Sequence, residues 1–147
     1  MNYVTTEEAN TYFAGRLHTE VWDDATNSDR TKALTMATKA IDKLNFAGSM
    51  TVSTQELQFP RGGDVLAPAD IKEATCELAL RLLDGIDVDR EIENLRVLES
   101  GNSSIKTTYN RDMVPEYVLA GIPSPKAWNL LIPYLRDART LSIDRVN

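Results

Sequence analysis

The sequence has few of the residues on which small catalytic sites are usually built. It contains one cysteine, Cys76, and one histidine, His18, in 147 residues. A single cysteine excludes an internal disulfide framework, and no Gly-x-Ser-x-Gly motif gives His18 a nucleophile to activate. Cys76 lies in a helical apolar pattern, where a buried thiol is the ordinary interpretation. We therefore expect a protein that is not an enzyme.

Motifs for nucleotide and metal binding are also missing. The pair Gly62-Gly63 is not followed by Lys-Ser/Thr, and no Gly-x-Gly-x-x-Gly occurs, so a phosphate-binding loop is not indicated. An acidic cluster, Asp84, Asp87, Asp89 and Glu91, lacks the central glycine and the final glutamate of an EF-hand loop. We interpret the cluster as a solvated acidic face and expect neither a metal nor a cofactor.

Long apolar runs are absent. None approaches the roughly 20 residues that cross a bilayer, and the segment Met1-Asn2-Tyr3-Val4 lacks the basic and apolar regions of a signal peptide. We expect a soluble protein made in the cytoplasm, with no membrane partner.

Positive charge is scarce and uneven. The net charge is −6; residues 1–100 hold 10 Lys/Arg against 18 Asp/Glu, whereas residues 101–147 hold 6 against 4. An acidic body repels phosphate, and a chain that grips nucleic acid is expected to show a denser basic stripe. The charge distribution therefore favours protein partners.

Helical spacing of apolar residues accounts for most of what is present. Thr5-Thr6-Glu7-Glu8 is a capping box that opens a helix ending near residues 15–17, and residues 20–25 can form a single turn. A second helix is expected from a cap at Asn27 or Ser28 to Gly48, and a short acidic helix over residues 87–95. The widest apolar stripe, over residues 68–84, predicts a central helix contacted from two sides in a three- or four-helix bundle.

The segments between these helices carry weaker signals. In the loop of residues 46–67 we expect Leu57 and Phe59 to plug the core while Arg61-Gly62-Gly63 turns outside. Residues 97–100 and 105–109 flank a glycine- and serine-rich turn and predict a β-hairpin. Residues 113–121 are interpreted as a linker.

The C-terminal region combines a capped helix with an alternating tail. Ser124 is a good N-cap, Pro125 suits the first helical position, and Pro133 must kink or restart the helix. Residues 138–147 predict an extended docking tail after an adaptor domain of residues 1–137; an edge strand on the same domain, or a frayed end, are the alternatives. The fold expected is mainly α, a small helical bundle with a short β-hairpin and an extended C-terminal tail.

Six segments, taken in order, resemble a known family. They are residues 4–13, Trp22, residues 32–42, Phe59-Pro60-Arg61, residues 69–79 and Gly121-Ile122-Pro123-Ser124-Pro125. The series is similar to the head-tail connector, or adaptor, proteins of tailed double-stranded DNA bacteriophages, which include small phage proteins labelled DnaT-like single-stranded DNA-binding proteins.

The resemblance implies a structural virion protein made in a bacterial host. It would form a homo-oligomeric ring, usually of twelve copies, under the portal protein, extending the channel through which double-stranded DNA passes and linking it to stopper or tail proteins. Two sets of site residues follow. The portal-docking tail is Leu141, Ser142, Ile143, Asp144, Arg145 and Val146. The candidate subunit or tail interface, for which core packing is the alternative in the hairpin, is Phe59, Arg61, Ile105, Thr107 and Tyr109.

An alternative follows from the DnaT-like label itself. A replication accessory protein would bind single-stranded DNA, and the residues that fit this role are Trp22, Tyr109, Arg111, Arg136 and Arg139. Steep loss of affinity with rising salt would distinguish this function from that of a connector.

Overall fold

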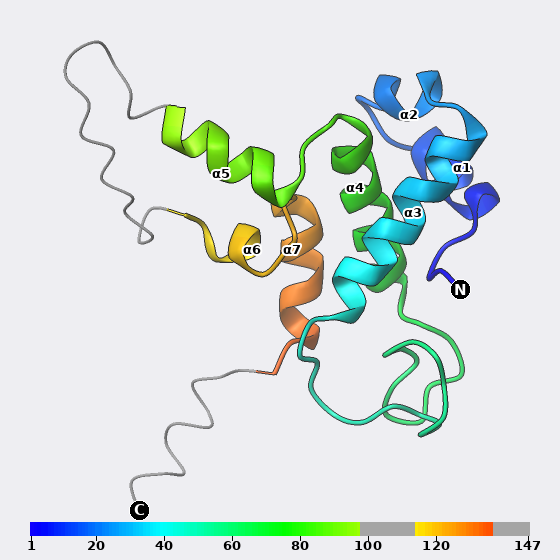
Figure 1. Ribbon diagram of the computed structural model, residues 1–147. Helices are drawn as coiled ribbons and strands as arrows, with labels where there is room; N and C mark the ends of the chain where they lie inside the picture. Colours follow the sequence, from blue (N-terminus) through cyan, green and yellow to red (C-terminus); the bar gives the residue numbers. More distant parts are fainter. Residues whose placement is uncertain (98–113, 137–147) are drawn as a thin grey trace, which may run out of the picture.

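A computed structural model describes residues 1–97 and 114–136 of the chain (Figure 1). The described part is mainly helical, as predicted. Its elements are α1 (Thr6–Ala14), α2 (Glu20–Asp24), α3 (Asn27–Asp42), α4 (Ala69–Leu83), α5 (Val88–Val97), α6 (Glu116–Leu119), α7 (Pro125–Leu131) and the 3-10 helix η2 (Ile132–Tyr134). No helix within the described ranges has the length and apolar composition needed to span a bilayer.

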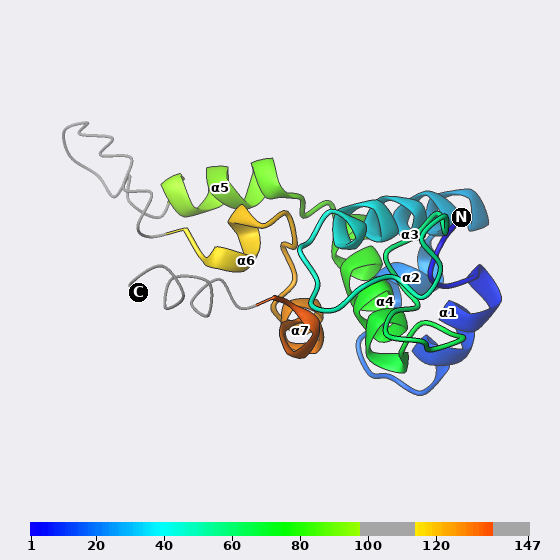
Figure 2. The same cartoon turned by 90° about the horizontal axis from the view of Figure 1, so that it is seen from below.

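Helix α4 is the centre of the fold. It packs against α3 on one side and α7 on the other, and it also contacts α1 and α2 (Figures 1 and 2). An unbroken run of its residues, from Ala74 to Leu80, is buried. The prediction of a central helix contacted from two sides is confirmed, because an apolar stripe this broad is covered only when neighbours pack on both faces.

Side-chain caps fix the starts of three helices. Thr5 and Glu8 form the predicted capping box of α1, and the Ser124 hydroxyl accepts from the amide of Ala127 (3.2 Å) at the start of α7. The cap of α3 is Thr26 and not Asn27 or Ser28 as predicted, and its hydroxyl accepts from the amide of Asp29 (3.1 Å). Sequence alone did not separate these adjacent polar residues, since each can cap a helix.

Aromatic rings hold the long loop after α3 against the bundle. Phe59 packs edge-to-face on Tyr3, Phe46 and Tyr134, with ring centroids 4.7–6.2 Å apart. Phe59 is buried and Leu57 half-buried, which confirms that this pair plugs the core. Phe46 also pairs with Leu135 in an isolated antiparallel bridge, so the loop meets the end of the C-terminal helix.

Two predictions for residues 97–121 need correction. The described residues contain no strand, and α5 continues through Val97, where the hairpin was expected to begin; the rest of the predicted hairpin lies outside the described residues. Glu91, Glu93, Leu95 and Arg96, which precede Val97, favour helix, and this outweighs the β-propensity of one valine. Residues 113–121 are not only linker, because α6 forms there and buries Val118.

Proline ends the C-terminal helix as expected. α7 stops at Leu131 and continues as η2, which contains Pro133. Ala127 and Leu131 are fully buried, Trp128 and Leu135 are partly buried against the core, and Ile132 is 49% exposed. The predicted extended tail, residues 138–147, lies outside the described residues, and the division into domain and tail stays a prediction.

Candidate nucleic-acid interface

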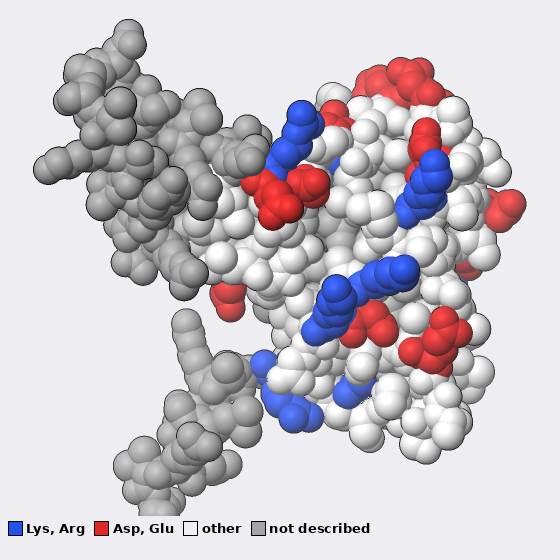
Figure 3. Space-filling view, viewed as in Figure 1, with Lys and Arg blue, Asp and Glu red and all other residues white. Residues whose placement is uncertain are grey.

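Three lysines lie in one line along the exposed side of α3. Lys32, Lys39 and Lys43 are exposed, and at 3.6 residues per turn their directions fall within about 40° of one another around the helix axis. The lysines span about 16 Å along that axis. Exposed Arg136 extends the line, because its backbone amide donates to the carbonyl of Asn45 (3.0 Å), just beyond the end of α3. We call these four residues the cationic stripe (Figure 3).

The members of the cationic stripe differ in how far their charge is already neutralised. Lys32 forms an ion pair with Asp29 (3.1 Å), and this hydrogen bond is the main cause that lowers the pKa of the Asp29 carboxyl. Lys39, Lys43 and Arg136 form no ion pair with any carboxylate of the described residues. The end of the stripe near Arg136 is therefore the part available to an external anion.

Arg61 lies beside the stripe but uses its donors inside the protein. Its guanidinium donates to the carbonyls of Ala47 (3.0 Å) and Gly48 (2.6 Å) and to the side-chain oxygen of Gln58 (2.8 Å). These bonds organise the loop after α3 and leave the positive charge without a carboxylate partner among the described residues. Arg61 therefore adds to the local positive field while acting as a structural residue.

The same loop is tied to α3 through a buried tyrosine. The Tyr3 hydroxyl donates to Asp42, the last residue of α3, and accepts from the amide of Phe59 (3.3 Å). Asp42 also accepts from the amide of Gln58 (2.7 Å). Burial, with the hydrogen bond to Asp42 as the second cause, raises the pKa of Tyr3. This anchor holds the loop that carries Arg61 next to the C-terminal end of α3.

Alkaline pH is expected to destabilise the protein through Tyr3. The pKa of Tyr3 is higher in the folded state than the ordinary value of about 10, so above that pH only the unfolded chain releases the proton. Stability from neutral Tyr3 is complete below pH ~10 and falls as pH rises toward the folded-state pKa, by up to about 1.4 kcal/mol per pH unit. Urea unfolding at about pH 8, 10 and 11 measures this slope. Tyr3→Phe should make it shallower, and equal slopes would contradict the prediction.

A family model agrees with a surface of this kind. The model, described as "Putative DnaT-like ssDNA binding protein", matches residues 2–146, nearly the whole chain. This chain belongs to the DnaT-like ssDNA-binding protein family. Comparisons with curated proteins and with solved structures gave no match.

Membership in the DnaT-like family corrects the identification as a head-tail connector. The matching model is not a connector family, so the predicted ring under a portal, the stopper and tail partners and the double-stranded DNA channel are wrong. The order of the six segments could not distinguish a connector from a DnaT-like protein. Most of their residues lie in the core or cap helices, so they indicate the fold and not the function. The location in a virion was implied by the same resemblance alone and has no other support.

For a DnaT-like protein, the residues expected to contact DNA are only partly in place. Trp22 is 1% exposed, its indole donates to Asn10 (3.0 Å), and its ring packs on Phe13, so it cannot stack on a base. Arg136 is exposed in the cationic stripe, whereas Tyr109, Arg111 and Arg139 lie outside the described residues. Sequence analysis missed Lys39 and Lys43, because exposed lysines are common on amphipathic helices. Only the fold shows that they lie near Arg136.

Of the residues expected at a subunit or tail interface, the two that the structure describes are not free surface residues. Phe59 is buried in the core, and Arg61 is partly buried and bonded to carbonyl groups. The remaining predicted residues, Ile105, Thr107, Tyr109 and the tail from Leu141 to Val146, lie outside the described residues.

The thiol of Cys76 is held within the structure. Cys76 is 2% exposed, and burial raises the pKa of its thiol to about 12, which keeps it protonated and unreactive at neutral pH. Across residues 1–97 and 114–136, no group of three or more His, Cys, Asp or Glu side chains is placed to hold a metal ion.

Proposed function

We propose that this protein binds single-stranded DNA along the cationic stripe, with Lys39, Lys43 and Arg136 contacting phosphates. The observation that carries the proposal is the position of these three cations. They gather at one end of α3, exposed and without carboxylate partners among the described residues, in a member of a DnaT-like family.

The chemistry of the stripe favours contact with the backbone over reading of bases. Lysine ammonium groups attract phosphate as point charges and carry no sequence information. Two tyrosines lie near this end of the described structure: Tyr3 is buried, and Tyr134 is partly buried and donates its hydroxyl to Asp70 (2.9 Å), so stacking contributes little there. The proposal therefore predicts binding without sequence preference.

The acidic body limits where a strand can lie. With a net charge of −6, most of the surface repels phosphate, so the strand is confined to the stripe. Arg139, which follows Arg136 in the sequence and lies outside the described residues, stays a predicted contact. Tyr109 and Arg111 stay predicted contacts. The proposed role is non-catalytic.

Charge reversal of the stripe is expected to abolish most of the affinity for DNA. If three to five phosphates are neutralised, log K should fall against log salt with a slope of about −2 to −3.5, so raising salt from about 50 to 200 mM weakens binding by about 20- to 100-fold. Lys39→Glu/Lys43→Glu/Arg136→Glu should lower the slope by about 2 and the low-salt affinity by at least tenfold. Fluorescence anisotropy with labelled oligo-dT measures both quantities.

Lys126→Glu, compared with the single variant Lys43→Glu, is the control for charge reversal away from the stripe, since Lys126 is also exposed but lies at the opposite end of α7 from Arg136. It should keep at least half of the wild-type affinity. Equal losses in the control and in Lys43→Glu would show a non-specific charge effect, and unchanged binding by the triple variant would remove the stripe from the interface. Circular dichroism of each variant checks that the helices are intact.

A further inference from the structure

A groove with an apolar floor runs along α3 on the flank next to the cationic stripe. It consists of two hollows, of about 220 and about 450 Å³, which share Met36 and Leu82. The smaller hollow lies between α3, α4 and the start of α5, and the larger one between α2, α3 and the end of α4. The apolar side chains of the floor include Val21, Met36, Ala40, Leu78, Leu82 and Leu83.

Met36 marks the centre of this groove. It is 54% exposed in the middle of a regular helix, and Leu82 and Leu83 beside it are only half-buried. At 100° per residue, Met36 and Ala40 point to one side of the line of lysines. Apolar area that folding leaves uncovered is available for association with a partner.

Carboxylates surround both ends of the groove. Asp24 and Asp29 line the larger hollow, and Asp87 and Asp89 line the smaller one. The only basic side chain in either lining is Lys32, which is paired with Asp29. Figure 3 shows red side chains over the start of α5 and at the end of α3 nearest α2, with a blue side chain beside each group. This rim repels phosphate, so the groove is not a continuation of the DNA track.

We propose that the groove binds a segment of a partner protein in which apolar side chains are flanked by lysine or arginine. The apolar floor would cover the hydrophobic residues of that segment, and the rim carboxylates would pair with its cations. Complementary charge selects the partner and its orientation, while burial of apolar area supplies affinity. One helix, α3, would then present DNA-binding lysines and, directly beside them, a protein-binding groove.

The experiment uses the full chain and synthetic peptide probes. A fluorescein-labelled peptide of about 16 residues carries leucines at helical spacing with lysines on both sides. In a second peptide glutamate replaces each lysine, and in a third serine replaces each leucine. Anisotropy should show the lysine–leucine peptide binding at least tenfold more tightly than either of the others.

Variants of the chain place the binding in the groove. Met36→Gln keeps the length and helix propensity of the side chain, removes its apolar character and should weaken the lysine–leucine peptide by about fivefold or more. Val52→Gln is the matched control, because Val52 is 55% exposed on the loop after α3, and it should change nothing. Asp24→Asn/Asp89→Asn should weaken binding severalfold and reduce its dependence on salt.

Several results would overturn the proposal. These are equal binding of the lysine and glutamate peptides, no binding of any peptide, or binding unchanged by Met36→Gln. Two further results would assign the groove to another occupant and equally overturn it. The first is self-association that Met36→Gln removes, which would make a second copy of the chain the occupant. The second is tighter peptide binding after deletion of residues 137–147, which would make that segment of the chain the occupant. Oligo-dT affinity, measured on the same variants, reports the proposed DNA binding separately.

Discussion

Trp22→Ala is expected to lower the free energy of unfolding by about 3–5 kcal/mol. The Trp22 ring is 1% exposed and packs on Phe13 with centroids 4.7 Å apart. Its indole donates to Asn10, and the guanidinium of Arg30 lies 5.4 Å from the ring centroid. Alanine would leave a cavity and strip these contacts at once. Urea denaturation monitored by circular dichroism measures the loss.

The outcome for DNA binding separates a core role from a stacking role. Under conditions where Trp22→Ala and the milder Trp22→Phe stay folded, both should bind oligo-dT as wild type does. Trp128→Ala is a useful comparison, because Trp128 is only partly buried and should cost less stability. A Trp22 variant with native stability and lost DNA affinity would contradict the structure's placement of this ring.

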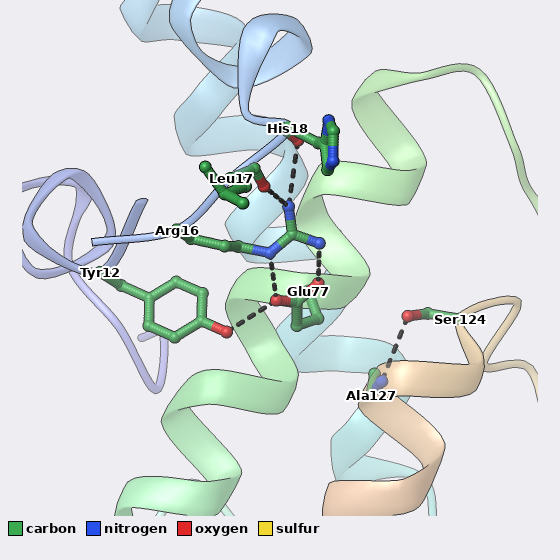
Figure 4. A network of polar contacts seen from close by, with 7 residues as sticks. All are labelled: Tyr12, Arg16, Leu17, His18, Glu77, Ser124 and Ala127. Carbon is green, nitrogen blue, oxygen red and sulfur yellow. Dashed lines mark hydrogen bonds and ion pairs between the residues drawn. The ribbon is translucent and has the colours of Figure 1, made fainter. Parts of the chain in front are cut away.

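Arg16→Met is expected to destabilise the protein by about 3–5 kcal/mol, because it leaves a buried carboxylate without its counter-charge. The Glu77 carboxylate, 4% exposed on α4, receives Arg16 Nε (2.7 Å), Arg16 Nη2 (2.9 Å) and the Tyr12 hydroxyl (2.7 Å) (Figure 4). Arg16 also donates to the carbonyls of Leu17 (2.6 Å) and His18 (3.0 Å), which fixes the turn after α1.

A double variant distinguishes an orphaned charge from lost packing. Arg16→Met/Glu77→Met removes both ions while keeping apolar volume, so it should be more stable than Arg16→Met alone. Lys72→Met is the exposed counterpart, since it breaks only the pair with Glu8 (2.8 Å) and should cost less than about 1 kcal/mol. Urea midpoints of the three variants give the comparison. A loss below about 0.5 kcal/mol for Arg16→Met would show that water reaches Glu77.

Local patterns predicted the helices better than they predicted the surface. The capping box at Thr5, the broad stripe of α4 and the Ser124-Pro125 start of α7 are confirmed, because each depends on residues near one another in sequence. α6 was missed because a helix of four residues has no measurable periodicity. A hairpin was expected from residue 97, but helix propensity in α5 carries through that position.

The candidate site was harder to predict from the sequence than the helices, because it depends on contacts between residues far apart in the chain. Whether a lysine or arginine is free depends on which carboxylates and carbonyls the fold brings to it. Arg61 was expected on an outer turn, yet its donors are used by the loop, whereas Lys39 and Lys43 drew no attention and prove exposed. Trp22 was suggested as a stacking platform because sequence shows its size but not its burial.

The junction between the loop after α3 and η2 also bears on the order of folding. Ala47 donates to the carbonyl of Tyr134 (2.9 Å) and Arg136 donates to that of Asn45 (3.0 Å), joining parts of the backbone about 90 residues apart in sequence. Closing so long a loop is entropically slow, whereas α3 and α4 depend on contacts closer along the chain. We expect this junction to form after α3 and α4 have packed, so that Arg136 would join Lys39 and Lys43 late in folding.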